Sequence, residues 1–330
     1  MIEVTALLKA YGDISALKNI SFSFAKGGIH GVLGAVGSGK TTLCDILSGV
    51  IAADLGIVRI NGADAADDPL AARRRIGYLP QVVPLYENMT VYEYLLFIGE
   101  AKGVSYDKLY RNINSVMELT DITEVKNTLT KKLYQSQRRR LGIAQTMLGN
   151  PDVIILDEPF SDLDGDGAFE MKELVKKLGE VKTIIISSSS LDIISELCDD
   201  MIIMSSGEII AQGELGELEG KIGRAQALCI SVRGQESSVV SAFAGIDGLV
   251  DCVVLENKAG VVSLRLEYER GYEIRDSVFS AMADAGYPIL SMETRALTLE
   301  DVYLKLIAEA KCESSEKSEK KVEKKRGKRR

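Results

Sequence analysis

A glycine-rich segment, GAVGSGKTT at residues 34–42, carries the strongest chemical signal in the sequence. It fits the pattern GxxxxGK[ST], in which glycines let the backbone bend until its N–H groups converge on phosphate oxygens. An apolar run precedes it and a helical pattern follows, so a helix N-terminus adds partial positive charge. We expect Lys40 to reach the β- and γ-phosphates and the Thr41 hydroxyl to ligate Mg²⁺. A glycine-rich turn without a ligand is the weaker interpretation. The residues expected to hold the phosphates are Gly34, Ala35, Val36, Gly37, Ser38, Gly39, Lys40, Thr41 and Thr42.

Two adjacent carboxylates, Asp157 and Glu158, follow the apolar run VIIL at residues 153–156. In open α/β sheets, ligands bind at the carboxyl ends of the strands, where these two side chains would emerge. Asp157 suits a contact to Mg²⁺, and Glu158 suits a base that orients or deprotonates an attacking water. A strand that ends in Asp-Glu is weak evidence alone, but it becomes strong in a chain that also has a phosphate-binding loop.

Composition excludes several other kinds of site. The 330 residues include one histidine, His30, so a histidine-rich metal site is excluded, and His30 is expected to be a packed core or edge residue. The five cysteines are scattered without a CxxC pair, which predicts reduced thiols in the cytoplasm rather than disulfides or a zinc site. The formal net charge of −8 argues against general nucleic-acid binding. We expect no signal peptide and no membrane span, because no run of about 18 apolar residues is visible.

Short apolar runs alternate with helical patterns in the first part of the chain, which predicts an α/β domain with a largely parallel sheet at residues 1–217. The predicted strands are residues 29–33, 77–79, 153–156, 183–187 and 201–204. The predicted helices are residues 41–48, 91–102, 106–119, 138–148 and 167–178. Residues 2–8 and 20–24 predict a small antiparallel addition to this domain.

The pattern changes after this domain. Residues 220–310 are expected to form a small α+β accessory domain, because their order of strands and helices is that of a ferredoxin-like fold, β-α-β-β-α-β, with a last helix at 298–309. Residues 311–330 hold ten Lys or Arg and four Glu, and we expect them to be a disordered basic tail. Such a tail suits contact with anionic lipid, although a solvated tail without a partner is an equal alternative.

These elements together resemble the ATP-binding subunit of an ABC transporter, which implies a P-loop NTPase fold with ATP and Mg²⁺ as cofactors. Residues 77–81 (GYLPQ) are similar to the family's glutamine loop, which implies that Gln81 contacts the metal and the attacking water. Residues 84–95 and 298–304 resemble an exporter branch that includes drug-efflux and gliding-motility ATPases. Tyr11 stands where the family places an aromatic ring on the adenine, and Asp164 lies in a segment that resembles the loop crossing to a second subunit.

Two segments depart from the family pattern. The signature Leu-Ser-Gly-Gly-Gln aligns with LYQSQ at residues 133–137, so that Tyr134 replaces the serine and Ser136 replaces a glycine, while Gln137 is retained. In the family this segment contacts the nucleotide held by the other subunit. The switch histidine aligns with Ser189, which is shorter and cannot become cationic. Because removal of one transition-state contact costs about 10²–10³ in rate, we expect near-normal binding of ATP and slow hydrolysis.

The resemblance also implies partners. We expect a separate membrane-spanning permease subunit and a second ATP-binding subunit, in a homodimer or a heterodimer, with this chain at the cytoplasmic face of the cell membrane. One alternative is a nucleotide-gated regulatory subunit that closes on ATP with little hydrolysis. Another, less favoured, is a soluble ATPase that acts on ribosomes or DNA, since the chain has one cassette and no long coiled-coil insertion.

Overall fold

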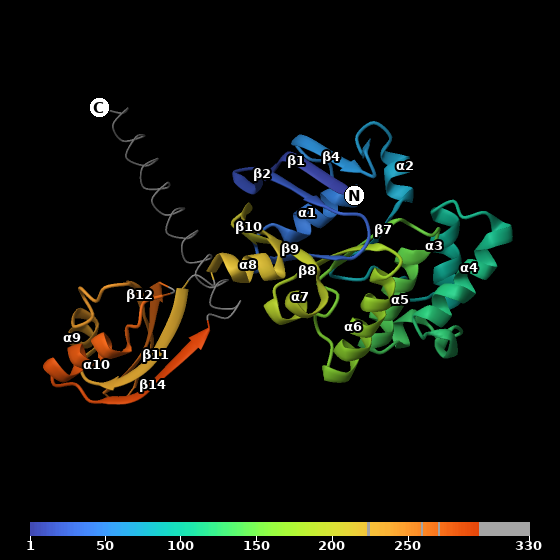
Figure 1. Ribbon diagram of the computed structural model, residues 1–330. Helices are drawn as coiled ribbons and strands as arrows, with labels where there is room; N and C mark the ends of the chain where they lie inside the picture. Colours follow the sequence, from blue (N-terminus) through green and yellow to red (C-terminus); the bar gives the residue numbers. More distant parts are fainter. Residues whose placement is uncertain (223–224, 259, 270, 297–330) are drawn as a thin grey trace. The chain divides into compact units, whose positions relative to one another are not determined.

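The computed structural model describes residues 1–222, 225–258, 260–269 and 271–296. The chain divides into two compact units, Met1–Leu215 and a second unit that begins at Gly216 (Figure 1). No helix within these described ranges combines the length and apolar character needed to cross a membrane. The predicted helix at 298–309 and the basic tail at 311–330 lie outside the described residues.

A six-stranded sheet forms the centre of the first unit. Its strands are β3 (Ile29–Gly34), β6 (Ile76–Leu79), β7 (Val153–Asp157), β8 (Thr183–Ser188), β9 (Asp200–Ser205) and β10 (Glu208–Glu214). They lie in the order β10-β9-β3-β8-β7-β6, and all neighbours except the antiparallel pair β10–β9 are parallel. The predicted parallel sheet is therefore confirmed, with β10 as an edge strand that was not predicted. Every residue of β3, β7 and β8 is buried, which explains why their central residues are mostly apolar on both faces of the sheet.

A second, antiparallel sheet has the order β2-β1-β4-β5. Its strands are β1 (Ile2–Tyr11), β2 (Ile14–Phe24), β4 (Leu55–Ile60) and β5 (Ala63–Asp64). It confirms the predicted antiparallel addition and extends it by two strands. The helix α1 (Lys40–Leu47) packs between the two sheets, and the apolar side chains of α1 share one core with both of them (Figure 1). The phosphate-loop helix is thus fixed from two sides.

The other helices of this unit cover the six-stranded sheet or form a separate helical group. They are α2 (Pro69–Arg74), α3 (Val91–Ala101), α4 (Tyr106–Leu119), α5 (Gln135–Met147), α6 (Gly165–Gly179) and α7 (Leu191–Leu197), with α8 (Leu215–Ile222) at the boundary. The helices α3, α4 and α5 share a core of their own. The start of α5 precedes the predicted residue 138, because the side chain of Gln137 accepts a hydrogen bond from the Tyr134 backbone N–H and closes an earlier turn.

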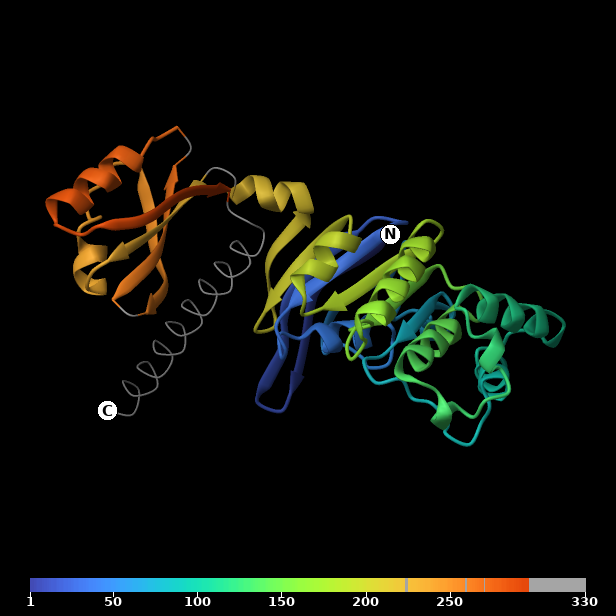
Figure 2. The same ribbon diagram turned by 90° about the horizontal axis from the view of Figure 1, so that it is seen from below.

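The second unit has the ferredoxin-like order that the sequence predicts. Its elements are β11 (Ala225–Arg233), α9 (Glu236–Ser241), β12 (Leu249–Lys258), β13 (Val261–Glu269), α10 (Arg275–Asp284) and β14 (Ile289–Ala296). The strands pair antiparallel in the order β12-β13-β11-β14. Both helices lie on one face of this sheet (Figure 2), where Phe243, Val278 and Met282 are buried against the strands.

The N-terminus of α3 carries a capping box that the adjacent α4 lacks. The Thr90 hydroxyl accepts a hydrogen bond from the Glu93 backbone N–H at 3.2 Å, and the Glu93 carboxylate accepts one from the Thr90 N–H at 2.8 Å. These bonds hold the pKa of Glu93 below its ordinary value. Their contribution to the stability of the folded chain is therefore lost as the pH falls through that lowered pKa. Ser105 is the N-cap of α4, but its side chain makes no capping bond.

Replacement of Thr90 by alanine should therefore lower the free energy of unfolding by about 1 kcal/mol, because one backbone N–H of the first turn loses its partner. Urea denaturation monitored by circular dichroism would measure the change. The matched control is Ser105→Ala, which should change stability by less than half as much. Equal losses for the two variants would contradict the capping assignment.

Candidate nucleotide-binding site

The segments that carry the predicted chemistry follow four neighbouring strands, β3, β8, β7 and β6. The loop at residues 34–42 begins at the last residue of β3, and Ser189 directly follows β8. Asp157 ends β7, Glu158 comes next, and Gln81 lies shortly after β6. Because these strands are parallel, all four segments leave the same edge of the sheet.

The phosphate loop is held closely against its surroundings. Gly39 is the N-cap of α1 with φ of 104°, and a Cβ on it would lie 2.7 Å from the carbonyl oxygen of Ala16. A Cβ on Gly34 would lie 2.6 Å from the carbonyl oxygen of Met204. Val36, at the tip of the loop, is 93% exposed. The Ser38 Oγ is buried close to Gly34 and has no hydrogen-bond partner among the described residues.

Lys40 lies at the centre of the site. Its side chain is buried, and Nζ donates hydrogen bonds to the carbonyl oxygens of Gly34 at 2.7 Å and Ala35 at 3.2 Å. Nζ also lies 3.4 Å from Oε1 of Glu158. The structure therefore brings together the two charged residues that the sequence assigned to phosphate binding and to the activation of water.

Asp157 is fully buried at the end of β7. Its Oδ1 accepts a short hydrogen bond from the Ser187 hydroxyl, but its Oδ2 has no partner within the described ranges. A buried carboxylate oxygen without a partner is costly unless a cation or water completes it. The residues present thus fit Mg²⁺: Asp157 offers an oxygen, and Thr41 offers a hydroxyl in the first turn of α1.

The backbone of Glu158 adopts a left-handed conformation with φ of 47°, which is uncommon for a residue other than glycine. Its N–H donates to the carbonyl oxygen and the hydroxyl oxygen of Ser187, each at 3.1 Å. Its carbonyl oxygen accepts from the Ser161 hydroxyl at 2.9 Å. Hydrogen bonds therefore fix both the N–H and the carbonyl group of Glu158, and its carboxylate lies beside Lys40.

Gln81 and Ser189 are both exposed at this edge of the sheet. Neither side chain makes a hydrogen bond to another described residue, so both are accessible to a ligand. The neighbouring Ser188 is buried, and its hydroxyl accepts a hydrogen bond from the Ser190 backbone N–H at 3.1 Å. Ser189 thus projects from a firmly held turn at the position aligned with the switch histidine.

Among the described residues, the signature segment lies beside the loop that follows β7 and not beside the phosphate loop. Tyr134 is the N-cap of α5 and is 78% exposed. Asp164 is the N-cap of α6, where its carboxylate accepts a hydrogen bond from the Gly167 N–H at 2.8 Å. A Cβ on Gly167 would lie 3.6 Å from the Cβ of Ser136, so the starts of α5 and α6 are neighbours. Tyr134, Ser136, Gln137 and Asp164 therefore form a second group, apart from Lys40.

Two further residues that the sequence singled out lie elsewhere in the first unit. Tyr11, at the end of β1, is 49% exposed and has the Lys9 ammonium 5.6 Å from its ring centroid. His30 is buried in β3, where Nδ1 lies 2.5 Å from an Asp200 carboxylate oxygen and the ring stacks on Phe24. His30 is therefore a packed core residue, as predicted.

Three residues in contact with the site were not predicted. Ser187 bonds to both Asp157 and the Glu158 backbone, Ser161 bonds to the Glu158 carbonyl, and Arg139 donates to the Ser161 hydroxyl at 2.7 Å. Ser187 ended the strand predicted at residues 183–187, and the structure places it within β8, opposite Asp157 of β7. No sequence pattern indicates the contact between Arg139 and Ser161, because α5 and the loop after β7 meet only in the folded chain.

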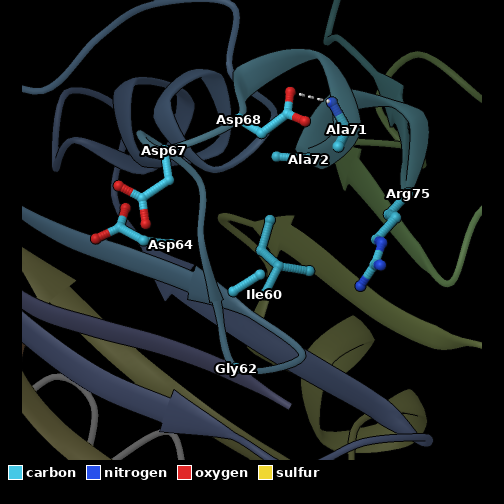
Figure 3. A pocket seen from close by; sticks show the side chains of 9 residues that line it. Ile60, Gly62, Asp64, Asp67, Asp68, Ala71, Ala72 and Arg75 are labelled. Carbon is cyan, nitrogen blue, oxygen red and sulfur yellow. Dashed lines mark hydrogen bonds between the residues drawn. The ribbon is translucent and has the colours of Figure 1, made fainter.

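A cavity of about 240 Å³ lies away from these residues, between β4, β5 and α2 (Figure 3). Asp64, Asp67 and Asp68 line it together with Arg75. Asp68 caps α2 through the Ala71 N–H, and Asp64 accepts from the Ala66 N–H. None of the residues predicted to bind nucleotide lines this cavity, and its surplus of carboxylates does not suit a triphosphate.

Comparisons with known proteins agree with this geometry. Residues 17–161 match the family model described as ABC transporter. Over 307 residues the chain is 30% identical to the ABC transporter ATP-binding protein YxlF of Bacillus subtilis, which covers 93% of this chain and 99% of the relative. It is 29% identical over 309 residues to the daunorubicin resistance ATP-binding protein DrrA3 of Streptomyces coeruleorubidus, which covers 92% of this chain and 95% of that relative.

Solved structures give the same result. An ATP-binding subunit of an ABC transporter superposes with a TM-score of 0.61 at 25% identity, covering 68% of this chain and 93% of that one. CbiO1 from Clostridium perfringens, part of an ABC transporter complex, superposes with a TM-score of 0.59 at 27% identity, covering 67% of this chain and 94% of that one. With a relative of 30% identity aligned along nearly its whole length, the chain belongs to the ATP-binding subunits of ABC transporters and is an ATPase of that type.

Proposed function

We propose that this chain is the motor subunit of an exporter, in which binding of MgATP closes two ATP-binding subunits and slow hydrolysis reopens them. The observation that carries the proposal is the buried Lys40 ammonium, held between two loop carbonyls and Glu158. Support for export comes from the relatives, since DrrA3 and the linearmycin resistance protein LnrL of Bacillus subtilis are resistance ATP-binding proteins. LnrL is 28% identical over 310 residues, which cover 93% of this chain and 98% of that relative.

The residues present suggest how the site operates. An entering triphosphate offers Lys40 several anionic oxygens in place of the loop carbonyls and Glu158. Glu158 is then free to orient or deprotonate a water molecule. Thr41, Asp157 and Gln81 would hold Mg²⁺, which neutralises charge on the phosphates when it is bound. Tyr11 would stack on the adenine.

The two departures from the family explain why we propose slow turnover. Ser189 cannot supply a cation to the γ-phosphate, and Tyr134 and Ser136 add bulk where glycine and serine allow a close approach. In a homodimer both sites would carry both defects, and in a heterodimer with an intact partner each site would carry one. Gln137 and Asp164 would still face the second subunit. The remaining Glu158 and Gln81 predict that hydrolysis is slow and not absent.

We also propose a membrane-spanning permease as the partner and the cytoplasmic face of the membrane as the location. The glutamine loop and residues 82–100 would carry the motion. Tyr86 and Phe97 of this segment are exposed, and their rings form an edge contact at 5.3 Å. The basic tail at 311–330 would add contact with anionic lipid. The domain boundaries proposed are 1–217, 220–310 and 311–330.

A second candidate function is a regulatory subunit that closes on ATP with little hydrolysis. The serine at the switch position and the tyrosine in the signature favour it. Steady-state ATPase activity, measured with and without the permease, separates the two functions.

Lys40→Ala should lower the affinity for MgATP at least tenfold in calorimetry, because the phosphates lose their buried cation. Glu158→Gln should retain binding but lose turnover, because an amide cannot accept the proton of water. Lys108→Ala, on the exposed surface of α4, is the matched control and should bind normally. MgATP affinity that is unchanged in Lys40→Ala would refute the proposed site.

Gly39→Ala should weaken MgATP binding far more than Gly37→Ala. Both glycines have positive φ, so each substitution carries about 1–2 kcal/mol of backbone strain. Only at Gly39 does the new Cβ also meet backbone, at the Ala16 carbonyl oxygen, whereas nothing lies within 4 Å at Gly37. Calorimetric titration of both folded variants measures the difference, and equal affinities would show that the loop tolerates movement.

Ser189→His should raise kcat about tenfold or more, because it restores a cationic donor at the γ-phosphate. Ser190→His, at the N-cap of α7, is the control and should not raise it. A Ser189→His variant that binds MgATP without any gain in rate would show that the signature segment, and not the switch position, limits turnover.

A further inference from the structure

A buried arginine stands beside the site without a role in the proposed function. Arg139 lies in α5 and is 3% exposed. One terminal nitrogen, Nη2, donates to the Ser161 hydroxyl at 2.7 Å. The other two nitrogens, Nε and Nη1, are buried and have no hydrogen-bond partner in the part of the chain that the structure describes.

This burial is costly, because a guanidinium removed from water needs its N–H groups bonded. Burial lowers the pKa of Arg139, and the nearby carboxylates of Asp162, Asp157 and Glu158 act against that shift. A glutamine or methionine would fill a similar space without a buried charge. A buried charge with two unbonded nitrogens therefore indicates a task beyond packing.

The bond of Arg139 leads directly to the proposed base. Ser161 Oγ, which accepts from Arg139, donates to the Glu158 carbonyl oxygen at 2.9 Å, and the Ser161 N–H donates to the same oxygen at 3.2 Å. On the other side, the Glu158 backbone N–H donates a hydrogen bond to the Ser187 hydroxyl. The left-handed backbone of Glu158 thus depends on two serines, of which one is fixed from α5.

We propose that Arg139 is a positioning residue for Glu158: through Ser161 it fixes the turn that directs the Glu158 carboxylate into the site, and so ties the start of α5 to the base. This inference rests on the proposed function, in which Glu158 activates water. It gives the signature helix a second role within its own subunit. A shift at the N-terminal turn of α5, which begins at Gln135, would move Arg139 and change the direction of Glu158.

The test compares Arg139→Gln, Ser161→Ala and the double variant in the full-length chain. We expect kcat for MgATP to fall 10- to 100-fold in Arg139→Gln while the dissociation constant for MgATP stays within twofold, because the phosphate loop is untouched. The double variant should lose little more than the worse single variant, since both break one chain of contacts. The matched control is Arg140→Gln: Arg140 pairs with Asp121 and Glu170 and should affect stability but leave kcat unchanged.

A second measurement does not depend on turnover. Hydrogen exchange of a peptide that spans residues 157–163 should be at least tenfold faster in Arg139→Gln than in the wild type or Arg140→Gln, because the Glu158 turn opens more often. A folded Arg139→Gln variant with wild-type kcat and wild-type exchange would overturn the inference. Fully multiplicative losses of kcat in the double variant would do the same. If the wild type hydrolyses no ATP, the proposed turnover fails, and the exchange measurement alone decides the role of Arg139.

Discussion

Parallel pairing of β3, β8, β7 and β6 is the constraint on which the site depends. It brings the phosphate loop, Ser189, the two carboxylates and the glutamine loop to one edge, although Gly34 and Ser189 are far apart in the sequence. The strands can lie there only because helices and the antiparallel sheet bury them completely. The chemistry of the site is therefore set by the core beneath it.

The sequence predicted the elements of this core well, because uninterrupted Ile, Val and Leu runs leave few alternatives. It also singled out Lys40 from the phosphate-loop pattern, and Asp157 and Glu158 from the apolar strand that they follow. The structure brings Lys40 to 3.4 Å from Glu158. The sequence did not predict the short elements α2, α7 and β5, which have too few residues for periodicity to indicate. It also missed the edge strand β10, in which no residue is fully buried and the apolar pattern is weak. The ferredoxin-like order of the second unit was predicted, because its strand and helix patterns follow one another in the order β-α-β-β-α-β.

The contacts that direct the site residues could not be predicted. Ser187 and Ser161 are small polar residues of a type found in any turn, and their bonds to Asp157 and Glu158 exist only once the ends of β7 and β8 are in register. Arg139 reads in sequence as one of three successive arginines at 138–140, of which Arg140 makes ion pairs to exposed carboxylates. Only packing of α5 against the loop after β7 distinguishes the buried arginine from its neighbours.

The ion pair between Lys40 and Glu158 has a consequence for how tightly nucleotide is held. An incoming phosphate must compete with an internal carboxylate for the same ammonium group, so part of its attraction replaces an existing one. In the proposed function, the same carboxylate would therefore weaken retention of the substrate and promote its cleavage. Loss of this acid would leave a subunit that binds nucleotide more tightly and releases it more slowly, so that the closed state would persist instead of turning over.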